Sequence, residues 1–248
     1  MPPKATTAAV VATLLFGVAD GAAAEPPAPT IAIDVGHSLA RPGATSARGR
    51  SEFEFNRELA LDVDRVLRQR GFATRLIGAD GDIDKLTERT DRAATAGATF
   101  FLSIHHDSVQ PQYLETGQLD GQVSHYTDRI SGFSLFVSRS NPDPATSFAC
   151  ARVIGQALRQ RGFTPSLHHA EPIRGENRPL ADAENGVYYF DDLVVLKTAR
   201  SPAVLVEAGV IVNRSDEVVL RQASTRQRLA GAIGDGLVTC RKVSSPAR

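Results

Sequence analysis

The chain has 248 residues, and its 28 basic and 28 acidic side chains give it a net charge of zero. This balance gives no electrostatic reason to expect a nucleic acid or an anionic membrane surface as the partner. The length is sufficient for one domain with a full hydrophobic core, and the sequence has no internal repeat that would suggest a second domain.

The first 24 residues have the order of a secretory signal peptide. A lysine at position 4 is followed by an apolar run from about residue 8 to residue 18 and then by three alanines before Glu25. A membrane anchor is the alternative, but this run is shorter than the ~20 residues that span a bilayer. We therefore expect cleavage after Ala24 and export, to the periplasm. The proline-rich residues 25–29 would then form a short linker.

The elements that follow alternate between strands and helices. Apolar runs rich in β-branched residues predict strands, and apolar residues at helical spacing that end near a glycine predict helices. In chain order we expect strand 30–36, loop 46–51, helix 52–70, strand 72–78, helix 83–97, strand 98–104, loop 107–131, strand 132–138, helix 147–162, loop 163–190, strands 191–197 and 203–209, and one or two helices over 215–240.

Several of these strands are apolar on both faces. Such strands, alternating with helices, are typical of an α/β domain with a mostly parallel, twisted sheet that helices flank on both faces. The two cysteines, Cys150 and Cys240, fall in predicted helices. Export to an oxidising compartment would allow one disulfide, but free buried cysteines are also common in helices. The spacing of the two cysteines therefore does not show whether they form a disulfide.

Reactive side chains stand at the ends of several predicted strands. His37 follows the first strand, His105 and His106 end the third, and Glu207 lies near the end of the strand VLVEAG. Ligands of α/β domains bind beyond the carboxyl ends of the strands. Histidines and carboxylates are the usual ligands of a catalytic zinc ion, and a spare carboxylate can act as a general base. The plainer alternatives are a loop-capping role for His37 and an ion pair for Glu207.

Three segments in this order resemble the zinc-dependent N-acetylmuramoyl-L-alanine amidases, the amidase-3 family. They are IDVGHSLARPGATSARGRSEFEFNRELA (33–60), FFLSIHHDS (100–108) and LVVLKTARSPAVLVEAGVIVN (193–213). The resemblance runs from about Ile31 to the last predicted helix. It implies a catalytic domain over residues 30–243, followed by a tail of residues 244–248.

The resemblance also implies the roles of four residues. His37, Glu52 and His105 would bind one zinc ion, and Glu207 would take the proton of the attacking water. The bond cleaved would be the amide between N-acetylmuramic acid and L-alanine in peptidoglycan or in muropeptides, during cell-wall remodelling, cell separation or recycling. The residues themselves indicate only zinc-dependent amide hydrolysis. Another exported zinc peptidase or deacetylase, or a catalytically silent peptidoglycan-binding protein, therefore stays open, and the sequence identifies no activator protein.

Two residues of the segment EFEFN, Glu52 and Glu54, could be the glutamate that binds zinc. Ser51 and Glu54 have the spacing of a capping box. In this motif the side chain of the glutamate accepts a hydrogen bond from the backbone N–H of the serine at the N-cap. This would occupy Glu54 and leave Glu52 free to face the metal. In the family, an asparagine follows the glutamate ligand by four residues. Asn56 stands in this position relative to Glu52, which the resemblance therefore favours as the ligand.

Three further histidines and one arginine carry weaker signals. Neighbouring residues on a strand point to opposite sides, so His106 should not share the metal with His105. It could orient a ligand, but we expect a partly exposed residue at the rim. For His168 and His169, with Glu171 nearby, we expect a cleft-lining or structural role, and a second metal ion is the alternative. Arg89 is expected to be solvated or ion-paired, without a catalytic role.

Overall fold

The structure is a computed structural model that describes residues 1 and 29–244. The predicted signal peptide, the linker up to residue 28 and residues 245–248 of the predicted tail lie outside this range, Met1 excepted. Within the described residues, no helix is both long enough and apolar enough to span a bilayer.

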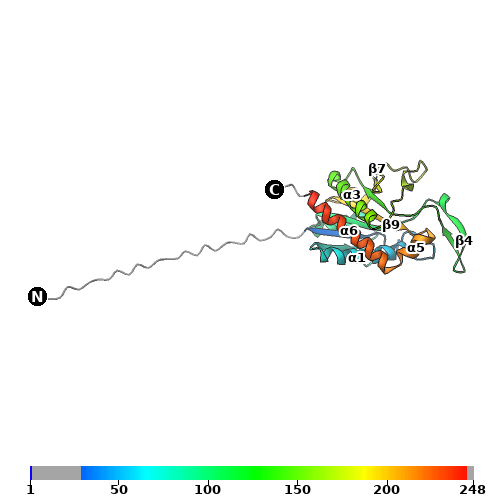
Figure 1. Ribbon diagram of the computed structural model, residues 1–248, viewed down its shortest axis with the longest axis horizontal. Helices are drawn as coiled ribbons and strands as arrows, with labels where there is room; N and C mark the ends of the chain where they lie inside the picture. Colours follow the sequence, from blue (N-terminus) through cyan, green and yellow to red (C-terminus); the bar gives the residue numbers. More distant parts are fainter. Residues whose placement is uncertain (2–28, 245–248) are drawn as a thin grey trace.

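Strands and helices alternate through most of the described chain (Figure 1). The strands are β1 (Thr30–Val35), β2 (Ala73–Ile77), β3 (Phe100–Asp107), β4 (Glu115–Leu119), β5 (Gln122–Tyr126), β6 (Ser134–Val137), β7 (Leu180–Asp182), β8 (Val187–Tyr189) and β9 (Ala203–Val210). The helices are α1 (Glu52–Gln69), α2 (Leu86–Thr95), α3 (Pro144–Gln160), α4 (Val194–Thr198), α5 (Arg214–Leu220) and α6 (Ala223–Ser244), with short 3-10 turns at Pro111–Tyr113 and His168–Ala170.

One seven-stranded sheet forms the centre of the domain, in the order β2-β1-β3-β9-β6-β8-β7. The first four strands are parallel to one another, whereas β6 is antiparallel to β9 and β7 is antiparallel to β8. Helices cover both faces of this sheet (Figure 1). The predicted fold, a single α/β domain with a mostly parallel sheet flanked by helices, is confirmed.

Alternate residues of the central strands enter separate cores on the two faces of the sheet. In β1 and β9, Ile31, Ile33, Val204 and Val206 join the core beneath α1, α3 and α6. Residues of the other parity, such as Ala203, join the core beneath α2 and α4. Because both faces are buried, these strands read as unbroken apolar runs in the sequence. Near the carboxyl ends of these strands, polar side chains replace apolar ones on the face of the sheet that α2 and α4 cover.

The structure corrects three of the expected elements. Residues 191–197 were expected to be a strand, but α4 occupies most of this run, with Val195 and Leu196 buried. A short apolar run cannot be assigned to helix or strand by periodicity alone. The expected loop 107–131 holds the antiparallel hairpin of β4 and β5, which extends from the body of the domain in Figure 1. The expected loop 163–190 holds β7 and β8.

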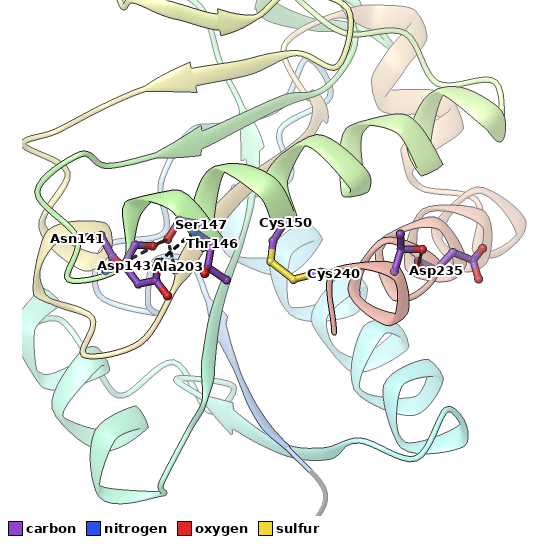
Figure 2. Close-up of a disulfide and its surroundings, with 9 residues drawn as sticks. Asn141, Asp143, Thr146, Ser147, Cys150, Ala203, Asp235 and Cys240 are labelled. Carbon is purple, nitrogen blue, oxygen red and sulfur yellow. Dashed lines mark hydrogen bonds between the residues drawn. A yellow bond between two sulfur atoms is a disulfide. The ribbon is translucent and has the colours of Figure 1, made fainter. Parts of the chain in front are cut away.

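Cys150 and Cys240 form a disulfide, which the spacing alone did not decide. The bridge joins α3 to α6, with the two Cα atoms 4.9 Å apart (Figure 2). Both cysteines are buried in the core beneath α1, α3 and α6. The bridge therefore connects two helices of one layer that are separated by 90 residues in the chain.

Candidate active site

The carboxyl ends of β1, β3 and β9 bring the predicted site residues to one edge of the sheet. His105 and Glu207 are register partners in the parallel pair of β3 and β9, so they stand side by side on the same face. Val35 pairs with Ile104, and the backbone N–H of Gly36 donates to the carbonyl of Ile104 at 3.0 Å. The chain leaves β1 at this point and reaches His37, whose ring centroid lies 5.0 Å from that of His105 at the end of β3.

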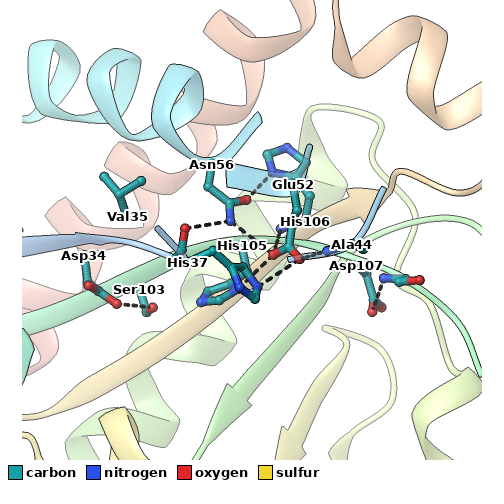
Figure 3. A network of polar contacts seen from close by, with 12 residues as sticks. Asp34, Val35, His37, Ala44, Glu52, Asn56, Ser103, His105, His106 and Asp107 are labelled. Carbon is teal, nitrogen blue, oxygen red and sulfur yellow. Dashed lines mark hydrogen bonds and ion pairs between the residues drawn. The ribbon is translucent and has the colours of Figure 1, made fainter. Parts of the chain in front are cut away.

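His37, Glu52 and His105 meet at this edge (Figure 3). Nε2 of His37 lies 2.9 Å from one carboxylate oxygen of Glu52, and Nδ1 of His105 lies 3.0 Å from the other. One donor atom from each of the three residues lies within 4.8 Å of the others, close enough to share one metal ion. Two imidazole nitrogens and a carboxylate are a ligand set that zinc prefers.

Two glycines make room for the side chains of these candidate ligands. A Cβ atom on Gly36 would stand 2.3 Å from the ring of His105, and one on Gly43 would stand 2.4 Å from the carboxylate of Glu52. Any side chain at either position would therefore push a ligand out of place. The close approach of backbone and ligands supports the fit of these three residues to a metal ion.

The position of Glu52 follows from the start of α1. Glu54 accepts from the backbone N–H of Ser51 at 3.1 Å, as the predicted capping box requires, and it also accepts from the Ser51 hydroxyl at 2.8 Å. Glu52 is instead buried and accepts from the backbone N–H of Ala44 at 3.1 Å. Burial opposes ionisation of the Glu52 carboxyl, but hydrogen bonds with His105 and His37 outweigh it and hold its pKa well below the ordinary value.

Arg89 fixes the backbone of His37. It is almost fully buried and pairs with Asp34 at 2.7 Å, and it donates to the carbonyl oxygens of Val35, Ile83 and His37. His37 has φ +68°, a conformation that costs a residue other than glycine on the order of 1–3 kcal/mol. The ion pair expected for Arg89 is present, and the structure adds a positioning role that the sequence did not indicate.

His106 is buried, and the expectation of a partly exposed rim residue is wrong. Its ring turns away from His105 into the opposite core, where it packs against Phe55 with ring centroids 5.4 Å apart. Nδ1 lies 2.8 Å from Oδ1 of Asn56, whose Nδ2 donates to Glu52 at 3.1 Å and to the carbonyl of Gly36 at 3.2 Å. Burial lowers the pKa of His106 to about 3, so the ring is neutral and holds Asn56 in the orientation that supports Glu52.

Glu207 faces a cavity of about 480 Å³ that His37 and His105 also line. Among the described residues, its buried Oε2 atom has no hydrogen-bond partner. Burial, and then the charges of Asp107 and Glu52, raise the pKa of Glu207 well above the ordinary value. A carboxyl group in this position is a strong base when ionised, and it borders the same cavity as two of the three candidate metal ligands, His37 and His105.

A second histidine cluster lies on the wall of the same cavity. His168 and His169 surround Asp107 near the end of β3, and Glu176 contacts His169 from the following loop. Glu171, the carboxylate expected nearby, is instead hydrogen-bonded by Tyr113. Burial alone would lower the pKa of His169, but Asp107 and Glu176 raise it to about 9. Asp107 and Glu176 were not singled out in the sequence, because their contacts depend on the path of the loop.

Comparison with known proteins shows which family and fold this chain shares. AmiA of Escherichia coli K12, an N-acetylmuramoyl-L-alanine amidase, is 24% identical over 218 residues, which cover 84% of this chain and 75% of AmiA. The fold matches the N-acetylmuramyl-L-alanine amidase Ami1 of Mycobacterium smegmatis with a TM-score of 0.69 at 22% identity, covering 88% of this chain and 99% of Ami1.

A second solved structure with this fold is the CwlD amidase of Clostridioides difficile, in complex with the GerS lipoprotein. Its TM-score is 0.66 at 20% identity, and the match covers 87% of this chain and 100% of CwlD. The Amidase_3 family, described as N-acetylmuramoyl-L-alanine amidase, matches residues 31–239. Since this match spans most of the sequence, the chain belongs to the Amidase_3 family of N-acetylmuramoyl-L-alanine amidases.

Proposed function

We propose that His37, Glu52 and His105 hold one zinc ion and that Glu207 is the general base of the reaction. Membership of the family gives the reaction itself, hydrolysis of the amide bond between N-acetylmuramic acid and L-alanine in peptidoglycan. The observation that carries the proposal is the convergence of three ligand atoms within 4.8 Å, beside a carboxylate that faces the same cavity.

When bound at these three residues, zinc would supply Lewis acidity that polarises a water molecule and the amide carbonyl. Glu207 accepts a proton from the attacking water as the water oxygen bonds to the carbonyl carbon. It then gives a proton to the leaving nitrogen as the C–N bond breaks, which balances the reaction. Its buried position supports this role, because a base with a raised pKa takes up a proton more readily.

Other residues of the site position these groups. Arg89 and Asp34 hold the backbone at His37, and Asn56 holds the carboxylate of Glu52. Apolar side chains line another part of the cavity, among them Phe136 and Leu205. A substrate that covers this wall would displace water from the reacting groups and strengthen their electrostatic interactions.

We propose further that the chain is exported to the periplasm and processed after Ala24, leaving a catalytic domain over residues 30–243. The order of charge, apolar run and alanines at the N-terminus supports this, and a cell-wall substrate requires a location outside the cytoplasm. An activator protein is an additional proposal, supported by the complex of the CwlD amidase with the GerS lipoprotein.

The test is to incubate the purified protein with sacculi and with soluble muropeptides, and to measure the new amino groups of L-alanine. We expect release of stem peptides, loss of activity with a chelator and recovery with Zn²⁺. Glu207→Gln should keep the zinc and lose activity by about 10²–10⁴-fold, the usual contribution of a general base. Glu184→Gln, at an exposed glutamate that pairs with Arg159, is the matched control.

Each alternative gives a different result. New ends within the peptide stem, or loss of acetyl groups, would identify a peptidase or a deacetylase. Binding to sacculi without any product would identify a silent binding protein. Unchanged activity in Glu207→Gln would reject Glu207 as the base.

A further inference from the structure

The cluster of Asp107, His168 and His169 has the geometry of a metal site. All three residues are buried, with exposed fractions of 7%, 4% and 7%. One donor atom from each lies within 4.8 Å of the others, the same condition that His37, Glu52 and His105 meet. This cluster shares no residue with His37, Glu52 and His105, although members of both sets line the same cavity.

Both imidazoles direct the same atom at one carboxylate oxygen. Nε2 of His169 lies 2.8 Å and Nε2 of His168 lies 3.5 Å from Oδ2 of Asp107. The buried Nε2 of His168 makes no hydrogen bond to any residue in the described part of the chain. A buried ring nitrogen without a hydrogen bond is costly, and one that faces a second imidazole nitrogen and a carboxylate is suited to coordinate a cation.

The opposite nitrogens of the two rings are held by hydrogen bonds. Nδ1 of His168 lies 2.9 Å from the hydroxyl of Ser166, and Nδ1 of His169 lies 2.7 Å from Glu176. Glu176 is itself fixed by the amide of Gln110 at 2.9 Å. Metal-binding histidines characteristically have their second nitrogen bonded to a carboxylate or another polar group, which sets the ring orientation and leaves the first nitrogen free for the metal.

A purely structural hydrogen-bonded wall explains this arrangement less well. It would satisfy His169 through Asp107 and Glu176, but it would leave Nε2 of His168 without a hydrogen bond. The two rings also lie with their centroids only 3.8 Å apart, so that their nitrogens crowd around one carboxylate. A shared cation would give both nitrogens and Asp107 a common partner.

We propose that Asp107, His168 and His169 form a second site for a divalent transition-metal ion, with Ser166 and Glu176 orienting the two imidazoles. Two imidazole nitrogens and a carboxylate oxygen suit Zn²⁺ and the neighbouring divalent metals. This site goes beyond the amidase reaction and does not depend on it, because neither its ligands nor their supports belong to the first group.

The experiment titrates the metal-free full chain with Zn²⁺ in a calorimeter and measures bound metal by mass spectrometry. The wild type should bind two ions per chain, and His168→Ala should bind one. Glu52→Ala should also bind one, at the remaining site, and the double variant should bind none. His125→Ala removes an exposed histidine of the β4–β5 hairpin and should still bind two.

Because His168 is buried, its variant could fail to fold, and a milder change keeps the test decisive. Glu176→Gln should fold as judged by circular dichroism and should weaken the second site about 10- to 100-fold without changing the first. One bound ion in the wild type that Glu52→Ala abolishes, or two ions in both His168→Ala and His169→Ala, would overturn the proposal. The Glu52→Ala titration reports on the first site separately, so either result leaves the amidase assignment untouched.

Discussion

The guanidinium of Arg89 donates to the backbone carbonyl of His37, so a buried side chain of α2 fixes the backbone of a candidate zinc ligand. The same group donates to the carbonyl of Val35 at 2.5 Å and pairs with Asp34 at 2.7 Å. Asp34 in turn accepts from the hydroxyl of Ser103 at 2.7 Å. These contacts therefore tie the ends of β1 and β3 together next to the candidate metal ligands His37 and His105.

Replacing Arg89 with lysine should separate this positioning role from simple charge. A lysine keeps the charge near Asp34 but cannot reach several carbonyls with a planar fork. We expect the free energy of unfolding to fall by about 1–3 kcal/mol and zinc affinity to fall about 10- to 100-fold. Urea denaturation and zinc titration measure the two effects. Arg92→Lys, at an exposed arginine of the same helix, is the control, and unchanged zinc affinity in Arg89→Lys would contradict the role.

Glu52 and Glu54 give a matched pair of variants within one turn of α1. Glu52→Ala should remove most of the zinc affinity of the first site, because it deletes the carboxylate between His37 and His105. Glu54→Ala should leave zinc binding unchanged and cost about 1 kcal/mol of stability through the lost helix cap. Thermal melts and zinc titration distinguish the two. Loss of zinc in Glu54→Ala, with only a loss of stability in Glu52→Ala, would show that Glu54 is the ligand and Glu52 the capping residue.

Much of the fold could be predicted because the central strands are buried on both faces and because glycines follow the ends of α1, α2 and α3. The elements that were missed are short or depend on the tertiary structure. The apolar run of α4 is brief enough to suit either a strand or a helix. The strands β7 and β8 have three residues each and exist because β6 offers an edge to pair with.

The site could be predicted in part for the same reason. His37, His105 and Glu207 follow or end strands, and parallel strands place their carboxyl ends together. The supporting residues are harder to find, since nothing local distinguishes a buried Arg89 from an exposed one on α2. The environment of His106 depends on the packing of α1, which places Asn56 and Phe55 against its ring.

Asn56 connects His106 to Glu52, and its replacement by aspartate tests that connection. The change removes the amide that donates to Glu52 and to the carbonyl of Gly36, and it brings a like charge toward Glu52. We expect the metal-free protein to lose about 1–3 kcal/mol of stability and zinc affinity to fall about 10- to 100-fold. Asn177→Asp, at an exposed position, controls for the added charge. Zinc affinity equal to that of the wild type would show that Asn56 does not position Glu52.

The disulfide between Cys150 and Cys240 should stabilise the fold without taking part in the chemistry. It lies in the core beneath α1, α3 and α6, whereas His105 and Glu207 project from the other face of the sheet. Closing a loop of this length restricts the unfolded chain, so replacing both cysteines with alanine should lower the free energy of unfolding by about 2–5 kcal/mol.

Urea denaturation with and without a reductant measures this contribution. The reductant should weaken the wild type about as much as the double replacement does, and it should not affect the double variant. Zinc content and amidase activity at a temperature where the variant is folded should match the wild type, because the bridge touches none of the proposed ligands. A loss of zinc from the folded variant would instead show that the packing of α3 against α6 positions the metal ligands across the sheet.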